Sequence, residues 1–286
     1  MIWQKDSLKA TQPFYVLNTD KFLQEIYFRQ GISHFYSFRT AKRMTISTVP
    51  DGCIDLLFVY YGAGMKSYVC GSVLKCSQVE WEGPAEFFGV RFLPGFHPAG
   101  LLVTQRDLLE SRFPLERYLQ KQELIRLLAP QTDFCQRIRT FLREYTKMEE
   151  KREAPYGKKE LVASVKSLVY QSGGLIRIGE IENRTGYTAR YINKVFLEEM
   201  GFGPKTFCKI IQFQRALEYL NYGVPANMTD AAVALGYYDQ PQFIRDFKEY
   251  AGMTPAKYLR LVHDQTYRAR VRDMGFFLDS SACEGK

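Results

Sequence analysis

The chain has no long hydrophobic run and few of the residues that build metal or redox sites. Its longest apolar run, Leu56 to Tyr61, is far too short to cross a bilayer, and charges interrupt the first fourteen residues, where a secretion signal needs an apolar stretch. The six cysteines include no CxxC pair, and the three histidines, His34, His97 and His263, are isolated from one another. We therefore expect a cytoplasmic protein with reduced thiols, no metal, no cofactor and no membrane partner.

The rest of the composition is that of a globular protein. The 286 residues are 46% hydrophobic and 24% charged, which excludes collagen-like, coiled-coil and mainly disordered chains. At roughly 100–200 residues per domain, this length predicts two domains. The net charge of +8 favours a polyanionic partner such as nucleic acid. However, residues 1–155 carry 21 Lys and Arg against 17 Asp and Glu, and residues 156–286 carry 18 against 14, so each part nets +4 and charge alone does not locate a binding surface.

The two parts differ in the spacing of their apolar residues. Up to about Gly100, short apolar and aromatic runs such as 53–61, 68–74 and 87–93 lie between Gly, Pro and Asp residues. This pattern is typical of strands in an antiparallel sheet, sandwich or small barrel. From Thr104 the spacing lengthens to three and four, as on one face of a helix. The first part is therefore predicted to be mainly β and to be followed by helices.

One apolar stripe among these helices has two possible partners. It consists of Phe134, Ile138, Phe141, Leu142 and Tyr145. The stripe packs either on the β-rich domain or on the same helix of a second subunit, and the sequence leaves both alternatives open. After it, residues 147–159 are charged, poor in apolar side chains and interrupted by Pro155 and Gly157, which predicts a linker.

The C-terminal part contains an internal repeat. Gly186, Phe196, Gly201, Pro204 and Phe207 recur 50 or 51 residues later as Gly236, Phe247, Gly252, Pro255 and Tyr258. Each copy is predicted to be two helices joined by a tight turn, with Thr188 and Asp239 capping the second helices. Between the copies, residues 205–222 predict a helix of about 27 Å. Such a helix would hold the two copies near the spacing of successive major grooves on DNA, about 34 Å.

The second helix of each copy is predicted to have a polar outer face. Inward positions are Tyr191, Ile192, Val195 and Phe196 in the first copy and Phe243, Phe247 and Tyr250 in the second; outward positions are Arg190, Asn193, Lys194 and Leu197, and Gln240, Pro241, Ile244, Arg245 and Lys248. Arg and Lys pair with guanine edges or phosphates, Asn and Gln with adenine, and an apolar side chain contacts the thymine methyl group. One such face alone indicates only a solvated helix. Two at matching positions in duplicated units favour DNA binding.

The residues of the second copy carry a family resemblance. The stretch GYYDQPQFIRDFKEYAGMTPAKYLR, from Gly236 to Arg260, with Gly186-Tyr187, Phe196 and residues 201–204, resembles the AraC/XylS family of bacterial transcription regulators over about residues 158–262. The resemblance implies two helix-turn-helix subdomains joined by a long helix, promoter binding that recruits or positions RNA polymerase, and a homodimer. Pro241 departs from the family, in which many members carry a small polar or glutamine side chain there. The DNA-binding residues predicted on this basis are Thr188, Arg190, Asn193, Lys194, Gln240, Gln242, Ile244 and Arg245, of which Gln242 lies towards the capping side of its helix.

The N-terminal part resembles the sensor domains of such regulators, which are often a cupin-like β-barrel followed by dimerising helices. Residues 50–56 (PDGCIDL) and 89–95 (GVRFLPG) are similar to an uncharacterised branch of these domains. A barrel lined with rings would hold a small apolar or ring-containing effector. The residues predicted to bind it are Tyr36, Phe38, Asp55, Phe58, Tyr60, Phe88 and Arg91. The alternatives are that the rings are simply core, that Asp51-Gly52 is a turn and that Asp55 and Arg91 form a structural pair.

The predicted fold class is α+β. A β-rich sensor and dimerisation domain, cupin-like and followed by helices, spans residues 1–150, a linker 151–159, an all-α DNA-binding domain 160–262 and a C-terminal tail 263–286, for which we expect a frayed helix and a disordered end. We expect no enzyme, because a cupin metal site needs clustered histidines and the DNA alkylation repair of some family members needs a zinc-held cysteine cluster. Control by an effector, constitutive action and control by a protein partner all stay open.

Overall fold

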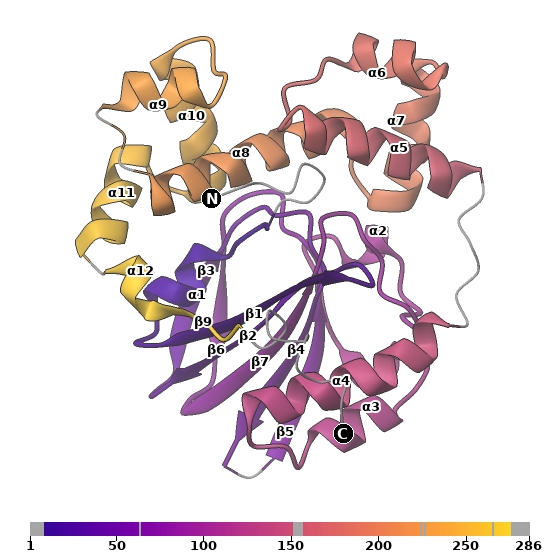
Figure 1. Ribbon diagram of the computed structural model, residues 1–286, viewed down its shortest axis with the longest axis vertical. Helices are drawn as coiled ribbons and strands as arrows, with labels where there is room; N and C mark the ends of the chain where they lie inside the picture. The colour runs from indigo at the N-terminus through magenta and orange to yellow at the C-terminus, as the bar shows by residue number, and fades with distance from the viewer. Residues whose placement is uncertain are drawn as a thin grey trace.

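A computed structural model of the chain describes residues 9–275 apart from 63, 151–156, 224, 226 and 265. The fold is α+β, as predicted (Figure 1). The strands are β1 (Phe22–Arg29), β2 (Ile32–Thr40), β3 (Met44–Thr48), β4 (Asp55–Tyr61), β5 (Gly64–Cys70), β6 (Ser77–Trp81), β7 (Ala85–Phe92), β8 (Arg112–Pro114) and β9 (Val271–Asp273). A seven-stranded sheet has the order β8-β5-β4-β7-β2-β1-β9, and β3 pairs with β6 in a separate two-stranded sheet. The predicted barrel is therefore two sheets within the described residues.

The helices fall into two groups along the chain. In the N-terminal domain these are α1 (Pro13–Leu17), α2 (Gln105–Leu108), the 3₁₀ turn η1 (Leu115–Arg117), α3 (Glu123–Leu128) and α4 (Phe134–Glu149). The C-terminal domain contains α5 (Lys158–Gln171), α6 (Ile178–Thr185), α7 (Ala189–Met200), α8 (Pro204–Tyr222), α9 (Met228–Ala234), α10 (Gln240–Ala251), α11 (Pro255–Asp264) and α12 (Tyr267–Arg270). Among the residues that the structure describes, no helix is long and apolar enough to span a membrane.

One face of the large sheet is covered by α3 and α4. Alternate residues of the strands point to this face, and the rings of Phe88 and Phe134 lie 6.0 Å apart while those of Phe35 and Phe141 lie 5.8 Å apart. The apolar stripe of α4 is thus buried on the sheet, where it forms one core with β2, β4 and β7. Of its two possible partners, the stripe takes the β-rich domain, and it is not available to a second subunit.

The other face of the large sheet packs on β3, β6 and α1, and through α1 on the C-terminal domain. All five residues of α1 are buried. Tyr15 contacts the sheet, with its ring 5.3 Å from that of Phe38, whereas Phe14 meets Tyr258 of α11 edge to face at 6.3 Å. The two domains consequently share one hydrophobic core that runs from the sheet into α8, α9, α10 and α11.

The predicted segments between and after the domains differ from expectation where they are described. Residues 151–156 of the predicted linker lie outside the described residues, and Lys158 and Lys159 already belong to α5. In the predicted tail, residues 263–275 complete α11 and form α12, as a helix prediction requires, and then form the short strand β9, which the sequence does not predict. Residues 276–286 of the tail lie outside the described part. The strand β9 forms because it pairs with β1 at the edge of the sheet, and the local sequence does not reveal this partner.

Candidate nucleic-acid interface

The first helix-turn-helix unit, α6 and α7, is built by a tight turn and a side-chain cap. Gly186 ends α6 with a left-handed φ of +74°, a conformation that glycine adopts without steric cost, and its N–H donates to Glu182 O at 2.8 Å. Thr188 then caps α7, because its Oγ1 accepts from the N–H of Tyr191. Ile192, Val195 and Phe196 of α7 are buried in the core of this unit. The predicted helices, turn and cap are confirmed here.

The outer face of α7 carries the predicted reading side chains. Arg190, Asn193 and Lys194 are exposed, and so is the capping residue Thr188. Tyr191 is also exposed, at 39%, so its predicted inward position is wrong. It lies about 100° around the helix from Ile192, at the edge of the buried arc, and its ring stacks on that of Tyr187 at 5.3 Å.

The second unit, α9 and α10, has the same architecture, but more of its polar side chains form hydrogen bonds within the unit. Asp239 caps α10 by accepting from Gln242 N at 2.7 Å, and Gln242 Oε1 accepts in return from Tyr238 N at 3.3 Å. Gln240 is half-buried, and its Oε1 accepts from Thr229 Oγ1 at 2.9 Å. Asn227 caps α9. Gln240 and Gln242 therefore hold the unit together in this structure.

The outer face of α10 is thus smaller than the sequence predicts. Arg245 is exposed together with Pro241 and Lys248, and Ile244 is half-buried beside it. Phe243, Phe247 and Tyr250 are buried, as predicted. Of the predicted DNA-binding residues, the exposed ones are Thr188, Arg190, Asn193 and Lys194 in the first unit and Arg245 in the second, whereas Gln240, Gln242 and Ile244 are half-buried.

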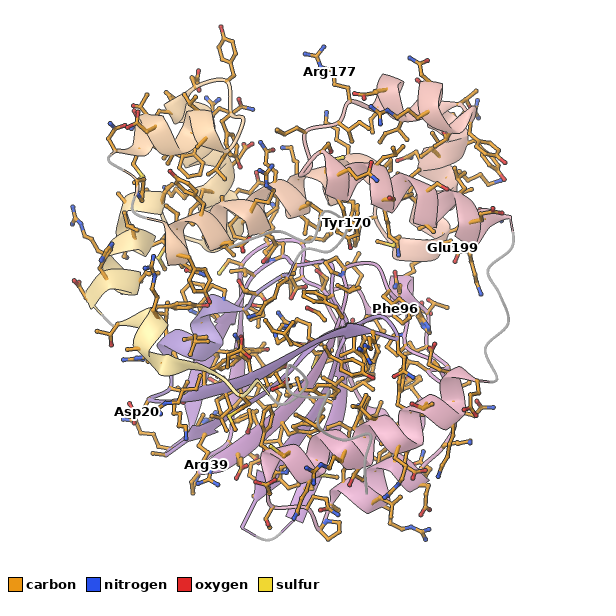
Figure 2. All side chains as sticks on the ribbon, viewed as in Figure 1. Asp20, Arg39, Phe96, Tyr170, Arg177 and Glu199 are labelled. Carbon is orange, nitrogen blue, oxygen red and sulfur yellow. The ribbon has the colours of Figure 1, made fainter. Side chains whose placement is uncertain are left out.

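Both units lie on the same side of α8, away from the large sheet (Figure 1). Arg177, which immediately precedes α6, extends from this side of the molecule (Figure 2). The 19 residues of α8 make a helix of about 28 Å, close to the separation of successive major grooves. The N-terminal domain covers neither basic helix face, since Arg190 and Lys194 on α7 and Arg245 and Lys248 on α10 are all exposed.

Comparison with known proteins gives a family match in each part of the chain. A family model described as a helix-turn-helix domain matches residues 181–261, which span both units, and a domain of unknown function (DUF6597) matches residues 28–114. Together with the motif from Gly236 to Arg260, the first match decides the assignment. The C-terminal part of the chain is a helix-turn-helix domain of the AraC/XylS type. The second match agrees with the similarity of residues 50–56 and 89–95 to an uncharacterised group of domains.

The proteins that this chain resembles are distant in sequence. The Msm operon regulatory protein of Streptococcus mutans is 22% identical over 107 residues, which cover 37% of this chain and 38% of that protein. Among solved structures, ToxT from Vibrio cholerae O395 is 11% identical with a TM-score of 0.44, covering 82% of this chain and 99% of ToxT. ToxT bound to (E)-4-(8-methylnaphthalen-1-yl)but-3-enoic acid is 11% identical with a TM-score of 0.46, covering 85% and 99%.

In the N-terminal domain, a buried ion-pair cluster joins three of the residues that the sequence singles out. Arg91, 2% exposed, donates from Nε to Asp55 Oδ1 at 2.9 Å and lies 3.3 Å from Asp51 Oδ2 through Nη1. Asp55 and Arg91 are register partners on β4 and β7, and Tyr36 donates its hydroxyl to Asp55 at 3.0 Å. Burial raises the pKa of Asp51 against the attraction of Arg91. The structural pair is confirmed, and Gly52 has a left-handed φ of +70° in the connection between β3 and β4.

This cluster forms the floor of a cavity between the two sheets. The inter-sheet cavity has a volume of about 330 Å³ and a mixed polar and apolar lining, which includes Tyr15, Cys53, Cys70, Trp81 and Arg112 in addition to Asp51, Asp55 and Arg91. Arg112 lies over the Trp81 ring at 4.4 Å. Burial raises the pKa of the Cys70 thiol to about 12, so the thiol is neutral.

The structure divides the predicted effector-binding residues between the two faces of the sheet. Asp55 and Arg91 line the inter-sheet cavity, and Tyr36 and Phe38 lie on the same face. Phe58, Tyr60 and Phe88 point to the opposite face and belong to the core under α3 and α4. Sequence reasoning missed Tyr15, Trp81 and Arg112, which come from segments far apart in the chain.

Proposed function

We propose that the protein is a sequence-specific DNA-binding transcription regulator, with α7 and α10 entering successive major grooves. One observation carries the proposal: two capped helix-turn-helix units lie on the same side of α8 (Figure 1), and each has exposed basic side chains on its second helix, Arg190 with Lys194 and Arg245. Because α10 has few exposed side chains that can contact bases, we expect Arg245 to read the second half-site with an apolar contact from Ile244.

Affinity for DNA tests this function. The wild-type chain is expected to select a duplex from a random-sequence pool and to bind it at least about a thousandfold more tightly than bulk DNA. The logarithm of the binding constant should fall linearly with the logarithm of salt concentration, because Lys and Arg displace counterions from phosphates. Equal affinity for selected and bulk DNA at every salt concentration would contradict sequence-specific binding.

The second part of the proposal is that a small apolar or ring-containing effector binds in the inter-sheet cavity. The volume of about 330 Å³ lies at the lower end of the range of small-molecule sites, and the rings of Tyr15 and Trp81 supply apolar surface beside the charged group of Arg91. The floor is also close to the C-terminal domain. Gln12 donates to Asp51 Oδ2 at 2.7 Å, and its neighbour Thr11 donates its N–H to Gln214 Oε1 of α8 at 2.8 Å.

A thermal-shift screen of the full chain against metabolites tests the effector. A ligand of the inter-sheet cavity is expected to raise the melting temperature of the wild type, because a ligand at a hundredfold excess over Kd adds about 2.7 kcal/mol to the stability of the folded state. Val79 lines the cavity and is half-buried. Val79→Phe should abolish the shift by filling the space, whereas the matched control Val79→Ile should keep it. Ligands that stabilise Val79→Phe as well as the wild type would show that the effector binds elsewhere. If no metabolite stabilises the chain and a protein partner changes its DNA binding, the partner-controlled alternative would be favoured.

Two partners and a location complete the proposal. A promoter-bound regulator of this family works with RNA polymerase and in the cytoplasm, where bacterial promoters lie. The family resemblance also implies a second copy of the chain. Its interface would have to use a surface other than the apolar stripe of α4, which the sheet already covers.

A further inference from the structure

The segment after the second helix-turn-helix unit turns back onto the N-terminal domain. Residues 266–275, which we call the strap, consist of α12, β9 and the residues on either side. In Figure 1 the strap runs from α11 down to the edge of the large sheet. There β9 pairs in parallel with β1, with Val271 opposite Phe22, and the N–H of Met274 donates to Gln24 O at 2.9 Å.

The strap is attached at its other end to α8. Tyr267 is 3% exposed, and its ring meets that of Tyr222 edge to face at 6.2 Å. Arg268 donates from Nε to Asn221 O at 3.0 Å, also at the C-terminal end of α8. The strap therefore joins the helix that carries the second unit to the first strand of the N-terminal domain.

Arg270 binds the strap to the end of α1 through two hydrogen bonds. Its Nη1 donates to Leu17 O at 2.7 Å and to Thr19 O at 2.9 Å, where the chain leaves α1. These carbonyls lie at the end of a helix, and the guanidinium supplies donors that the helix itself lacks there. Since α1 also contacts α11 through Phe14 and Tyr258, strap and α1 hold the second unit from two sides.

The first unit has separate attachments. Tyr170 of α5 donates its hydroxyl to Pro94 O at 2.7 Å (Figure 2), and Lys166 donates to Gly95 O at 2.8 Å. Each unit is thus fixed on the N-terminal domain by its own contacts, with α8 between them held by Gln214, which is 1% exposed. Removing the strap contacts would loosen the second unit and leave the first in place.

We propose that the strap positions the second helix-turn-helix unit for DNA, with Tyr267 and Arg270 as its positioning residues. The inference rests on the DNA-binding function proposed above. A two-site reader binds tightly when both recognition helices already have the spacing and orientation that the DNA requires, because less freedom is lost on binding. The strap supplies this order for α10 by tying α8 to β1.

The strap also adjoins the proposed effector site. Tyr15 and Arg91 line the inter-sheet cavity on one side and, on the other, a small cavity of about 20 Å³ beneath Tyr267 and Val271. A ligand that moved either side chain would act on the strap directly. A ligand in the inter-sheet cavity would thus affect the second unit through Tyr15 or Arg91 and the strap.

The test compares two arginines of the strap. Arg270→Ala removes the contacts to Leu17 and Thr19, and Arg272→Ala is a matched control that removes the same charge from an exposed side chain two residues away. On a duplex selected by the wild type, Arg270→Ala is expected to weaken binding about tenfold and to weaken the footprint only over the half-site read by α10. Binding to a duplex that keeps only the half-site read by α7 should be unchanged. Arg272→Ala should match the wild type, and Arg270→Lys should restore most of the affinity.

Hydrogen exchange on the full chain without DNA reports the strap itself. The amide of Met274 is expected to exchange faster in Arg270→Ala than in Arg272→Ala. Faster exchange with both footprints unchanged, an equal loss over both half-sites, or a gain in affinity would overturn the positioning role. Unchanged exchange would show that Arg270 does not hold the strap. If the wild type selects no DNA, the proposed function fails instead, and the exchange result stands apart from it.

Discussion

Arg91→Ala is expected to destabilise the chain by about 3–5 kcal/mol, the largest loss from any single substitution that we predict for its stability. Arg91 is the counter-charge of two buried carboxylates, Asp51 and Asp55. Without it, both remain in the interior with the hydroxyl of Tyr36 and the amide of Gln12 as neutral donors. Hydrogen bonds from neutral groups do not replace a charge that is withheld from water.

Urea unfolding at two pH values measures this effect. Burial already raises the pKa of Asp51, and loss of Arg91 should raise it further. A carboxyl whose pKa is higher in the folded than in the unfolded state loses stability as pH rises, so Arg91→Ala should be more destabilised at pH 8 than at pH 5. Arg43→Ala, which removes an exposed partner of Glu80, serves as the control and should change stability by no more than about 0.5 kcal/mol. A small, pH-independent loss for Arg91→Ala would show that the cluster is solvated.

The buried cluster bears on the effector as well as on stability. Asp55 and Arg91 pair across neighbouring strands, so the structural alternative that the sequence leaves open is confirmed. The same pair lines the inter-sheet cavity, and its role towards a ligand stays a prediction. A ligand next to this cluster would meet groups that are already hydrogen-bonded, which favours contact with the rings of Tyr15 and Trp81 and orientation by the other polar side chains of the lining.

Local signals in the sequence predict local structure well. The helix predicted for residues 205–222 is α8, Pro204–Tyr222, and the caps Thr188 and Asp239 take the predicted roles. Each of these features depends on a few neighbouring residues whose conformational preferences are strong. The tail is the opposite case, because β9 is only three residues long and exists through its pairing with β1 almost 250 residues earlier.

The division of the effector residues could have been predicted in part. Successive residues of a strand alternate between faces, so residues an odd number apart on one strand cannot share a face. Asp55 and Phe58 on β4, and Phe88 and Arg91 on β7, are such pairs. The positions of Tyr15 and Trp81 have no comparable local signal, because the fold alone brings α1 and β6 to the cavity.

On the DNA side, the largest effect is expected from the two arginines of the recognition helices. Arg190→Ala and Arg245→Ala should each cost about 1–3 kcal/mol on the selected duplex, if each reads a base. The residues lie on different helices, so the double variant should lose about the sum, 2–6 kcal/mol. Anisotropy titrations at one salt concentration measure these losses. Arg143→Ala, which removes an exposed arginine of α4 at the opposite end of the molecule (Figure 1), is the charge-matched control.

Sequence preference distinguishes base reading by these arginines from phosphate contact. Arg190→Ala should relax the preference at one position in the half-site read by α7, and Arg245→Ala at one position about ten base pairs away, in the half-site read by α10. A phosphate contact would instead weaken binding to all sequences alike and reduce the salt slope. Gln242→Ala should leave base preference unchanged, because its side chain caps α10. Altered preference in Gln242→Ala with none in Arg245→Ala would mean that α10 meets DNA through its first turn.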